Sequence, residues 1–307
     1  MVLHKNNQKQ AVLVTAYKNY HHLEEIVSFF NDNFEIFIHI DRKSSISSCE
    51  LNKLKKYSNV KLIAKKYKVN WGGYNHLQCI LFLVNEALKS DDNIYFHLIS
   101  GHDYPIKNIQ SFDYFLENQD QDFIDCFSVP FKGWGDLGGY DRLQYFSFYD
   151  LFNWKNIVQR KWIKKIINLQ IKFGYERSFP KKFPSLYGGS TWWSLSRESL
   201  LYVVRYTNAN QEFLKRFKYT FCAEEFYFQT ILMTSYRKSS IVNSNLRYID
   251  WSNRNGNNPS ILDITDLSKL LLSDSFFARR FDYPLSAVLL QNLKTNLHDL
   301  NCNTFYE

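Results

Sequence analysis

The first hundred residues alternate between two kinds of hydrophobic pattern. Continuous apolar runs rich in β-branched side chains predict strands that are buried on both faces. Between them, apolar residues recur at helical spacing. The predicted strands are residues 11–17, 35–41, 60–64 and 93–100, and the predicted helices are residues 23–30 and 76–88. Strands that alternate with helices in this way predict an α/β fold with a mostly parallel central sheet flanked by helices.

The second half of the chain is less regular. A glycine turn leads into a predicted strand within residues 187–195. Helical patterns cover residues 154–173, 197–206, 224–234 and 285–297. The sequence contains no internal repeat and no low-complexity linker, so we expect a single domain over residues 1–307.

Polar and glycine-rich segments follow the predicted parallel strands, at the edge where such sheets bind ligands. The segments are Tyr17, residues 39–43, Trp71-Gly72-Gly73 and residues 100–103. The Asp41 carboxylate suits a ribose or a base edge, and the Arg and Lys beside it suit phosphate. Glycines let the backbone approach a ligand, and an indole provides a flat wall. A charged loop and a tight turn around a buried Trp remain the alternative interpretations.

Two adjacent carboxylates, Glu224 and Glu225, open a predicted helix that is otherwise aliphatic and aromatic. They are either solvated charges favoured by the helix dipole, or one is a general base whose pKa is raised at an apolar site. Two adjacent arginines, Arg279 and Arg280, lie within an aromatic run. A desolvated guanidinium needs an anion, which a diphosphate would supply.

Composition narrows the class of partner. The net charge of +8 and an aromatic content of 18% indicate a nucleotide, a nucleic acid or an acidic membrane surface. Much of the charge lies in short lysine pairs, which are typical of solvated faces, so nucleic acid is not favoured. A basic, aromatic-rich nucleic-acid-binding protein nevertheless remains an alternative function.

The cysteines and the apolar runs indicate in which cellular compartment the protein is expected. The five cysteines include no C-x-x-C pair, so they predict neither a zinc site nor a disulfide framework and fit a reducing compartment. Residues 1–10 are polar and resemble no secretory signal, and no run of about 18 apolar residues occurs. We expect a cytoplasmic protein without a membrane span, and we hypothesise peripheral contact with anionic lipid at the inner membrane face.

Several chemistries lack their sequence signals. The chain has no G-x-x-x-x-G-K-[ST] or G-x-G-x-x-G phosphate loop, no H-E-x-x-H and no G-x-S-x-G. Its tight D-x-D, Asp120-Gln121-Asp122, precedes an apolar strand and does not follow one, which argues against a role in holding a divalent metal. We therefore expect no metal and no cofactor.

Six segments, taken in order, resemble the core-2/I-branching β-1,6-N-acetylglucosaminyltransferase family, which includes the peptide O-xylosyltransferases. They are residues 39–44, 71–73, 100–106, 188–193, 225–232 and 276–281. The resemblance implies a GT-A type nucleotide-sugar-binding fold without the usual metal-holding D-x-D. It also implies a UDP-sugar donor and an inverting displacement, with N-acetylglucosamine the favoured sugar and xylose the next.

The resemblance also implies roles for residues. It makes Glu225 the catalytic base, with Glu224 as the second choice. The implied UDP-sugar contacts are Asp41, Val69, Asn70, Trp71, Gly72, Arg279 and Arg280. The implied acceptor contacts are Asp103, Ser190, Thr191 and Trp192. On this basis residues 1–130 form the nucleotide-binding half, and residues 131–307 form the acceptor-binding and catalytic half.

Animal members of that family carry a membrane anchor, a stem and many disulfides, and we expect none of these features in this protein. It resembles the bare catalytic domain found in bacteria. We therefore expect a glycan or glycolipid acceptor in the synthesis of a bacterial surface polysaccharide, such as capsule or lipopolysaccharide. A catalytically inactive glycan-binding protein with the same fold is a further alternative, because fold alone does not establish activity.

Overall fold

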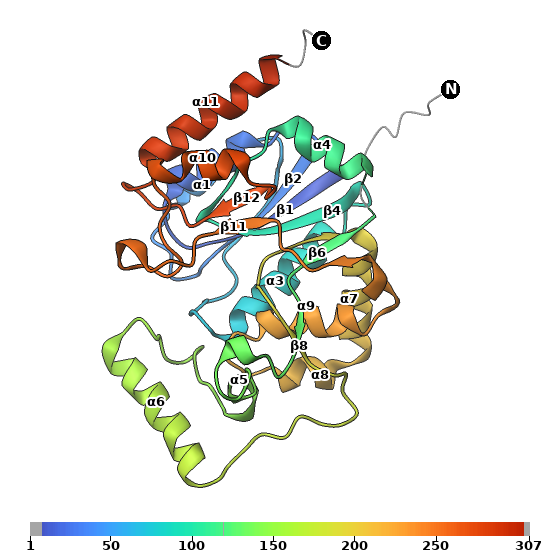
Figure 1. Ribbon diagram of the computed structural model, residues 1–307, viewed down its shortest axis with the longest axis vertical. Helices are drawn as coiled ribbons and strands as arrows, with labels where there is room; N and C mark the ends of the chain where they lie inside the picture. The colour runs from blue at the N-terminus through green and yellow to red at the C-terminus, as the bar shows by residue number, and fades with distance from the viewer. Residues whose placement is uncertain (1–7, 119, 304–307) are drawn as a thin grey trace.

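The computed structural model describes residues 8–118 and 120–303. Its centre is a seven-stranded sheet of order β10-β6-β9-β4-β1-β2-β3 (Figure 1). The strands are β1 (Lys9–Ala16), β2 (Phe34–Ile40), β3 (Val60–Ala64), β4 (Asn93–Ser100), β6 (Asp122–Ile124), β9 (Trp193–Ser196) and β10 (Ile241–Val242). All neighbours pair in parallel except β9, which is antiparallel to both β4 and β6.

Helices cover both faces of this sheet, which confirms the predicted α/β architecture. Along β1, Ala11 and Leu13 point into one core while Val12 and Val14 point into the other, as the two-residue period of a strand requires. One face carries α1 (Tyr20–Phe29), α2 (Ser48–Leu54), α4 (Ile109–Asn118), α10 (Leu267–Leu272) and α11 (Ala287–Asn303). The other carries α3 (Tyr74–Ala87), α7 (Arg197–Ala209), α8 (Gln211–Arg216) and α9 (Glu224–Met233).

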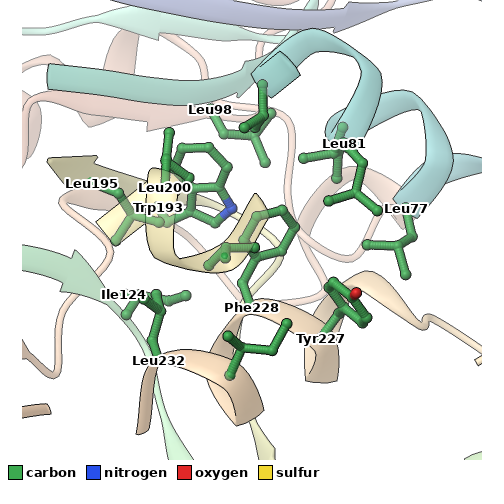
Figure 2. Packing of buried hydrophobic residues seen from close by; sticks show 14 of the residues in the cluster. Leu77, Leu81, Leu98, Ile124, Trp193, Leu195, Leu200, Tyr227, Phe228 and Leu232 are labelled. Carbon is green, nitrogen blue, oxygen red and sulfur yellow. The ribbon is translucent and has the colours of Figure 1, made fainter. Parts of the chain in front are cut away.

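Helix α9 lies in the middle of the hydrophobic core on the face of the sheet that carries α3, α7 and α8. Figure 2 shows Tyr227, Phe228 and Leu232 of this helix packed among side chains of α3, α7 and the sheet. Eight of its ten residues are buried. A helix that is apolar nearly all round is held by burial on every side, so its first turn occupies a fixed position.

Two smaller sheets complete the fold. One has the order β11 (Arg247–Ile249), β12 (Phe277–Arg279), β5 (Asp103–Pro105), with β12 and β5 antiparallel. The other pairs β7 (Phe127–Ser128) with β8 (Tyr187–Gly188) in antiparallel fashion. Short 3-10 helices span Lys132–Trp134, Tyr236–Ser240, Arg254–Gly256 and Ile264–Asp266.

A long excursion, residues 125–192, leaves the sheet after β6 and returns before β9. It contains α5 (Asp141–Gln144) and α6 (Ile157–Lys172). In Figure 1, α6 is the helix at the lower left, away from the central sheet. The amphipathic pattern over residues 154–173 therefore correctly predicts a helix, but it does not show that this helix stands outside the main core.

The remaining predicted elements agree with the structure to within a few residues, apart from α11, whose C-terminus lies six residues beyond the predicted end. The sequence patterns miss the helices α2, α4, α5, α8 and α10 and the short strands β5, β7, β10, β11 and β12. Of these, α2 carried a readable signal, because Ser47 and Glu50 form a capping box at its start. Among the described residues, no helix combines the length and the apolarity that crossing a membrane requires.

Candidate active site

Glu225 lies in the first turn of α9 and is one of two residues of that helix that are not buried. The other, Met233, is at the far end. The Glu225 side chain keeps 27% of its surface exposed. Glu225 is thus the carboxylate that α9 leaves accessible from the surface, since Glu224 is buried.

An arginine from the excursion pairs with this carboxylate. Nη1 of Arg142 donates a hydrogen bond of 2.7 Å to Oε2 of Glu225. The Arg142 guanidinium also stacks on the Trp134 ring, with Cζ 3.9 Å from the ring centroid. Burial and the charge of Glu224 raise the pKa of Glu225 to about 7, against the opposing effects of Arg142 and His76. A carboxyl group that titrates near neutral pH is suited to general-base chemistry.

Glu224, the other carboxylate of the pair, points into the protein. It is 4% exposed, and Oε1 lies 2.9 Å from Nδ1 of His76 in the first turn of α3. Its Oε2 is buried and has no hydrogen-bond partner among the described residues. Because the Glu225 side chain is partly exposed and the Glu224 side chain is buried, the geometry favours Glu225 as the base.

A stacked arginine lies within electrostatic reach of Glu225. Cζ of Arg279 is 4.2 Å from the Trp192 ring centroid, and its Nε is 3.4 Å from Oδ1 of Asp103. Burial lowers the pKa of Arg279, while the charges of Asp103 and Glu225 act in the opposite direction. Glu225 and Arg279 therefore lie near enough for their charges to interact.

Asp103 is completely buried. Its Oδ2 accepts a hydrogen bond from the Ser100 backbone N–H at 2.7 Å, and its Oδ1 accepts one from the Ser100 hydroxyl at 2.9 Å. The register of β5 and β12 places Asp103 directly opposite Arg279. With these partners the carboxylate suits a role in holding Arg279 better than the direct acceptor contact that the sequence suggests.

Arg280 lies beside a different carboxylate. Its Nη2 is 3.5 Å from Oδ2 of Asp282. The same carboxylate accepts hydrogen bonds of 2.8 Å from the side chains of Lys18 and Asn19, which follow β1. Arg280 is therefore placed near the carboxyl end of β1, the edge at which the sequence predicts ligand binding.

Asp41, Val69 and Asn70, three of the expected UDP contacts, lie close together. Oδ1 of Asp41 accepts hydrogen bonds from the backbone N–H groups of Lys43 at 2.9 Å and Val69 at 3.4 Å. The Lys43 ammonium donates to the Val69 carbonyl at 2.8 Å and to Oδ1 of Asn70 at 2.6 Å. Lys43 thus fastens the loop after β2 to the loop before α3.

Trp71 follows these residues and is 51% exposed. Its ring lies edge-on to Phe221, with centroids 5.1 Å apart. Gly72 has a φ of 77°, and a Cβ there would meet the Phe221 ring at 2.4 Å. The Gly72 carbonyl accepts a hydrogen bond of 3.0 Å from the backbone N–H of Cys222, three residues before Glu225. The Trp71 turn is therefore attached to the start of α9.

Ser190, Thr191 and Trp192 directly precede β9. Thr191 and Trp192 are buried, and Ser190 is half-buried with its carbonyl 2.7 Å from Nε2 of Gln229 in α9. Because β9 is antiparallel to β4, residues before β9 lie at the same edge as residues after β4. This reversal brings the expected acceptor segment to the edge of the sheet at which the sequence predicts ligand binding.

The two aspartates of the D-x-D segment differ, and only Asp122 is built into the interior of the fold. Asp122 is completely buried and accepts hydrogen bonds from the Ser196 backbone N–H, the Ser199 hydroxyl and the Arg237 guanidinium. The Asp120 side chain is 95% exposed. Within residues 8–118 and 120–303, His, Cys, Asp and Glu side chains form no cluster of three or more that could hold a metal ion.

Comparison with known proteins identifies the family. A family model described as "Core-2/I-Branching enzyme" matches residues 11–273. The chain belongs to the Core-2/I-Branching enzyme family. This confirms the family resemblance that the six sequence segments indicate.

Two curated proteins with different named activities are similar in sequence to this family member. It is 26% identical over 278 residues to "Xylosyltransferase oxt" of Drosophila pseudoobscura pseudoobscura, covering 83% of this chain and 29% of that protein. It is 26% identical over 282 residues to "Beta-glucuronosyltransferase GlcAT14A" of Arabidopsis thaliana, covering 83% of this chain and 57% of that protein. The chain thus spans less than a third of the length of the xylosyltransferase.

Solved structures give weaker similarities. The apo structure of "WbbM" bifunctional glycosyltransferase has a TM-score of 0.41 at 11% identity and covers 91% of this chain and 46% of that one. The apo form of mouse xyloside xylosyltransferase 1 has a TM-score of 0.37 at 11% identity and covers 88% of this chain and 97% of that one.

Two residues of this Core-2/I-Branching family member contribute to the site's geometry without having been singled out from the sequence. Arg142 had no motif around it. His76 stands three residues after Gly73, and the helix start at Tyr74 puts it in a first turn beside the site. Its closeness to Trp71-Gly72-Gly73 was its sequence signal. Lys43, which the sequence suggests for phosphate, donates instead to the Val69 carbonyl and the Asn70 side chain.

Proposed function

We propose that this chain is an inverting, metal-independent glycosyltransferase that moves a sugar from a UDP-sugar to a hydroxyl of a glycan or glycolipid acceptor. The observation that carries the proposal is the position of Glu225. It is a partly exposed carboxylate on an otherwise buried helix, burial and Glu224 raise its pKa to about 7, and its charge interacts with that of the stacked Arg279.

The proposed reaction is a single displacement. Glu225 takes the proton of the acceptor hydroxyl as that oxygen attacks the anomeric carbon from the face opposite UDP. The new C–O bond forms while the bond to the β-phosphate oxygen breaks, and UDP leaves with the electron pair. A positioned base of this kind contributes about 10²–10⁴-fold to the rate.

Fixed cations stabilise the charge that develops on UDP. In the proposal Arg279 and Arg280 do this in place of a metal. Asp103 supports that role, because it holds the Arg279 side chain from within the protein. Asp41, Val69 and Asn70 contact the uridine, with Trp71 as an adjoining wall. Thr191 and Trp192 lie on the acceptor side.

The sugar and the pathway belong to the proposal as well. N-acetylglucosamine leads and xylose follows, on the family resemblance. Relatives named as xylosyltransferases support xylose, whereas the relative named as a glucuronosyltransferase shows that the donor differs within the matched set. A cytoplasmic role in building a bacterial surface polysaccharide is the setting we propose.

The deciding experiment is calorimetric titration of UDP in EDTA, with ADP as the comparison. We expect micromolar binding of UDP and none of ADP, followed by turnover in a screen of UDP-sugars. NMR of the product then gives the anomeric configuration. Binding that requires added Mn²⁺ or Mg²⁺ would contradict the metal-independent mechanism, and a retained anomeric configuration would contradict the single displacement.

A further inference from the structure

Helix α6 exposes large apolar side chains to water. Only Ile163 of its sixteen residues is buried. Val158, Trp162 and Leu169 are 64%, 50% and 43% exposed, and Phe173, directly after the helix, is 76% exposed. The helix stands away from the central sheet in Figure 1. Gathered apolar surface of this kind marks an interaction site.

Seven exposed residues of α6 and its C-terminal cap form two lines along the helix, while the exposed Ile157 and Ile171 lie on neither. Their spacings of four and seven residues keep each set on one side of an α-helix. The apolar line is Val158, Trp162, Leu169 and Phe173, and the basic line is Lys161, Lys165 and Lys172. Since the second line is offset by three residues from the first, the two run side by side.

The charge of α6 has one sign. The helix contains one arginine, four lysines and no acidic residue. The four lysines border a shallow hollow of about 370 Å³: Lys161, Lys164, Lys165 and Lys172. Ammonium groups around a hollow, next to an exposed apolar line, match the anionic headgroup and the acyl boundary of a phospholipid surface.

We propose that α6 binds the surface of an anionic lipid bilayer, lying in the plane of the interface. The charge pattern decides between possible occupants. A second copy would bring the same unbalanced cations face to face across a two-fold contact. A nucleic acid would satisfy the lysines but leave the apolar line in water.

The other side of α6 connects it to the candidate site. Oε1 of Gln170 accepts from the backbone N–H of Phe146 at 2.8 Å, and Oε1 of Gln159 accepts from that of Asn153 at 2.7 Å. Trp154, in the same segment, lies 6.1 Å from Trp71 between ring centroids. Under the proposed function, a bilayer held by α6 would lie beside the site and present lipid-linked acceptors to it.

The test is sedimentation of the full chain with phosphatidylcholine vesicles that contain or lack phosphatidylglycerol, at low and physiological salt. We expect binding only to the anionic vesicles. Replacing the four lysines Lys161, Lys164, Lys165 and Lys172 by Gln should weaken it at least about a hundredfold, since each interfacial lysine contributes roughly fivefold. The control carries the same charge change at Lys53, Lys55, Lys56 and Lys61 and should bind much more tightly than the α6 variant.

A second pair of variants tests the apolar line without altering charge. Leu169→Ser should weaken vesicle binding by about tenfold, because it removes a leucine from the acyl boundary. Leu272→Ser, at a residue 85% exposed on α10, should not. UDP affinity is measured in parallel and should stay unchanged in all four proteins, which separates this proposal from the proposed function.

Three results would overturn the proposal. One is absence of binding to anionic vesicles at low salt. Another is equal binding by the α6 variants and their controls. The third combines two observations: the wild type does not bind vesicles, and Leu169→Ser changes the molar mass measured by light scattering. That result would assign α6 to contact between copies of the chain.

Discussion

Nη1 of Arg142 and Oε2 of Glu225 lie 2.7 Å apart, although 83 positions separate the two residues in the chain. The contact joins the excursion to the first turn of α9. It gives the proposed base a cationic partner, and Glu224 gives it an anionic neighbour. These two groups act on the pKa of Glu225 in opposite directions, which makes the site testable by pH.

Replacing Arg142 by Gln should move the acidic limb of the kcat/KM profile to higher pH. Arg142 lowers the pKa of Glu225, so its loss raises that pKa and the base becomes active only at higher pH. The wild type should lose activity as pH falls through about 7. The matched control is Arg205→Gln, an exposed arginine on α7. An unmoved acidic limb would show that Glu225 is not the group that titrates.

Replacing Glu224 by Gln should shift the same limb the other way. The Glu224 charge raises the pKa of Glu225, so a neutral amide lowers it and extends activity toward acid. The amide can still accept the hydrogen bond at His76. Shifts of the same sign in the Arg142 and Glu224 variants would contradict the assignment.

Glu225→Gln should bind UDP as the wild type does and lose about 10²–10⁴-fold in turnover, because only proton removal is lost. Calorimetry gives the first quantity and a coupled UDP-release assay gives the second. Turnover near the wild-type rate would remove Glu225 from the role of base.

Arg279→Ala should weaken UDP by about 10–100-fold, the loss expected for hydrogen bonds to a charged group, and should change uridine affinity much less. The variant removes the ion-pair partner of the buried Asp103, so thermal unfolding is recorded alongside. Arg279→Lys keeps the charge and should recover part of the UDP affinity. Equal losses for UDP and uridine would show that Arg279 does not contact the diphosphate.

Asp122→Ala should destabilise the protein by about 3–5 kcal/mol, since it leaves Arg237 without its buried partner. Asp120→Ala, at an exposed side chain, should fall within about 0.5 kcal/mol of the wild type. The milder Asp122→Asn should bind UDP equally well with Mn²⁺ and with EDTA. If Mn²⁺ strengthened UDP binding by the wild type but not by Asp122→Asn, Asp122 would be a metal ligand in the active site.

Gly72→Ala should lower both thermal stability and UDP affinity. Its φ of 77° disfavours any side chain, and the added Cβ would push against Phe221 and displace the Trp71 turn. Gly174→Ala is the control, because its φ of 62° brings the same backbone cost with no atom within 4 Å of the new Cβ. A similar effect on UDP affinity in both variants would show that the Phe221 contact is unimportant.

Local pattern was sufficient to locate the long strands β1, β2 and β4, the helix α9 and the carboxylate pair at its start. It could not rank Glu224 against Glu225, because which of them opens to the surface depends on packing around α9. Nor could it reveal Arg142, whose contact exists only after the excursion has folded back. The pairing of Asp103 with Arg279 depends on the register of two short strands. In each case the missing information is a distant contact.

The strands β6 and β9 are antiparallel neighbours, and β7 and β8 continue the pairing beyond them. Residues 125–192 therefore connect the two strands β6 and β9 as the loop of a β-hairpin does. A Cβ on Gly189 would lie 1.8 Å from the Asp125 carbonyl oxygen, so the two ends of this loop are drawn tightly together. Loop-closure entropy costs only about 0.6 kcal/mol for each doubling of length. The segment that carries Arg142 and α6 therefore closes at a narrow neck, so its length adds little to the loop-closure cost of pairing β6 with β9.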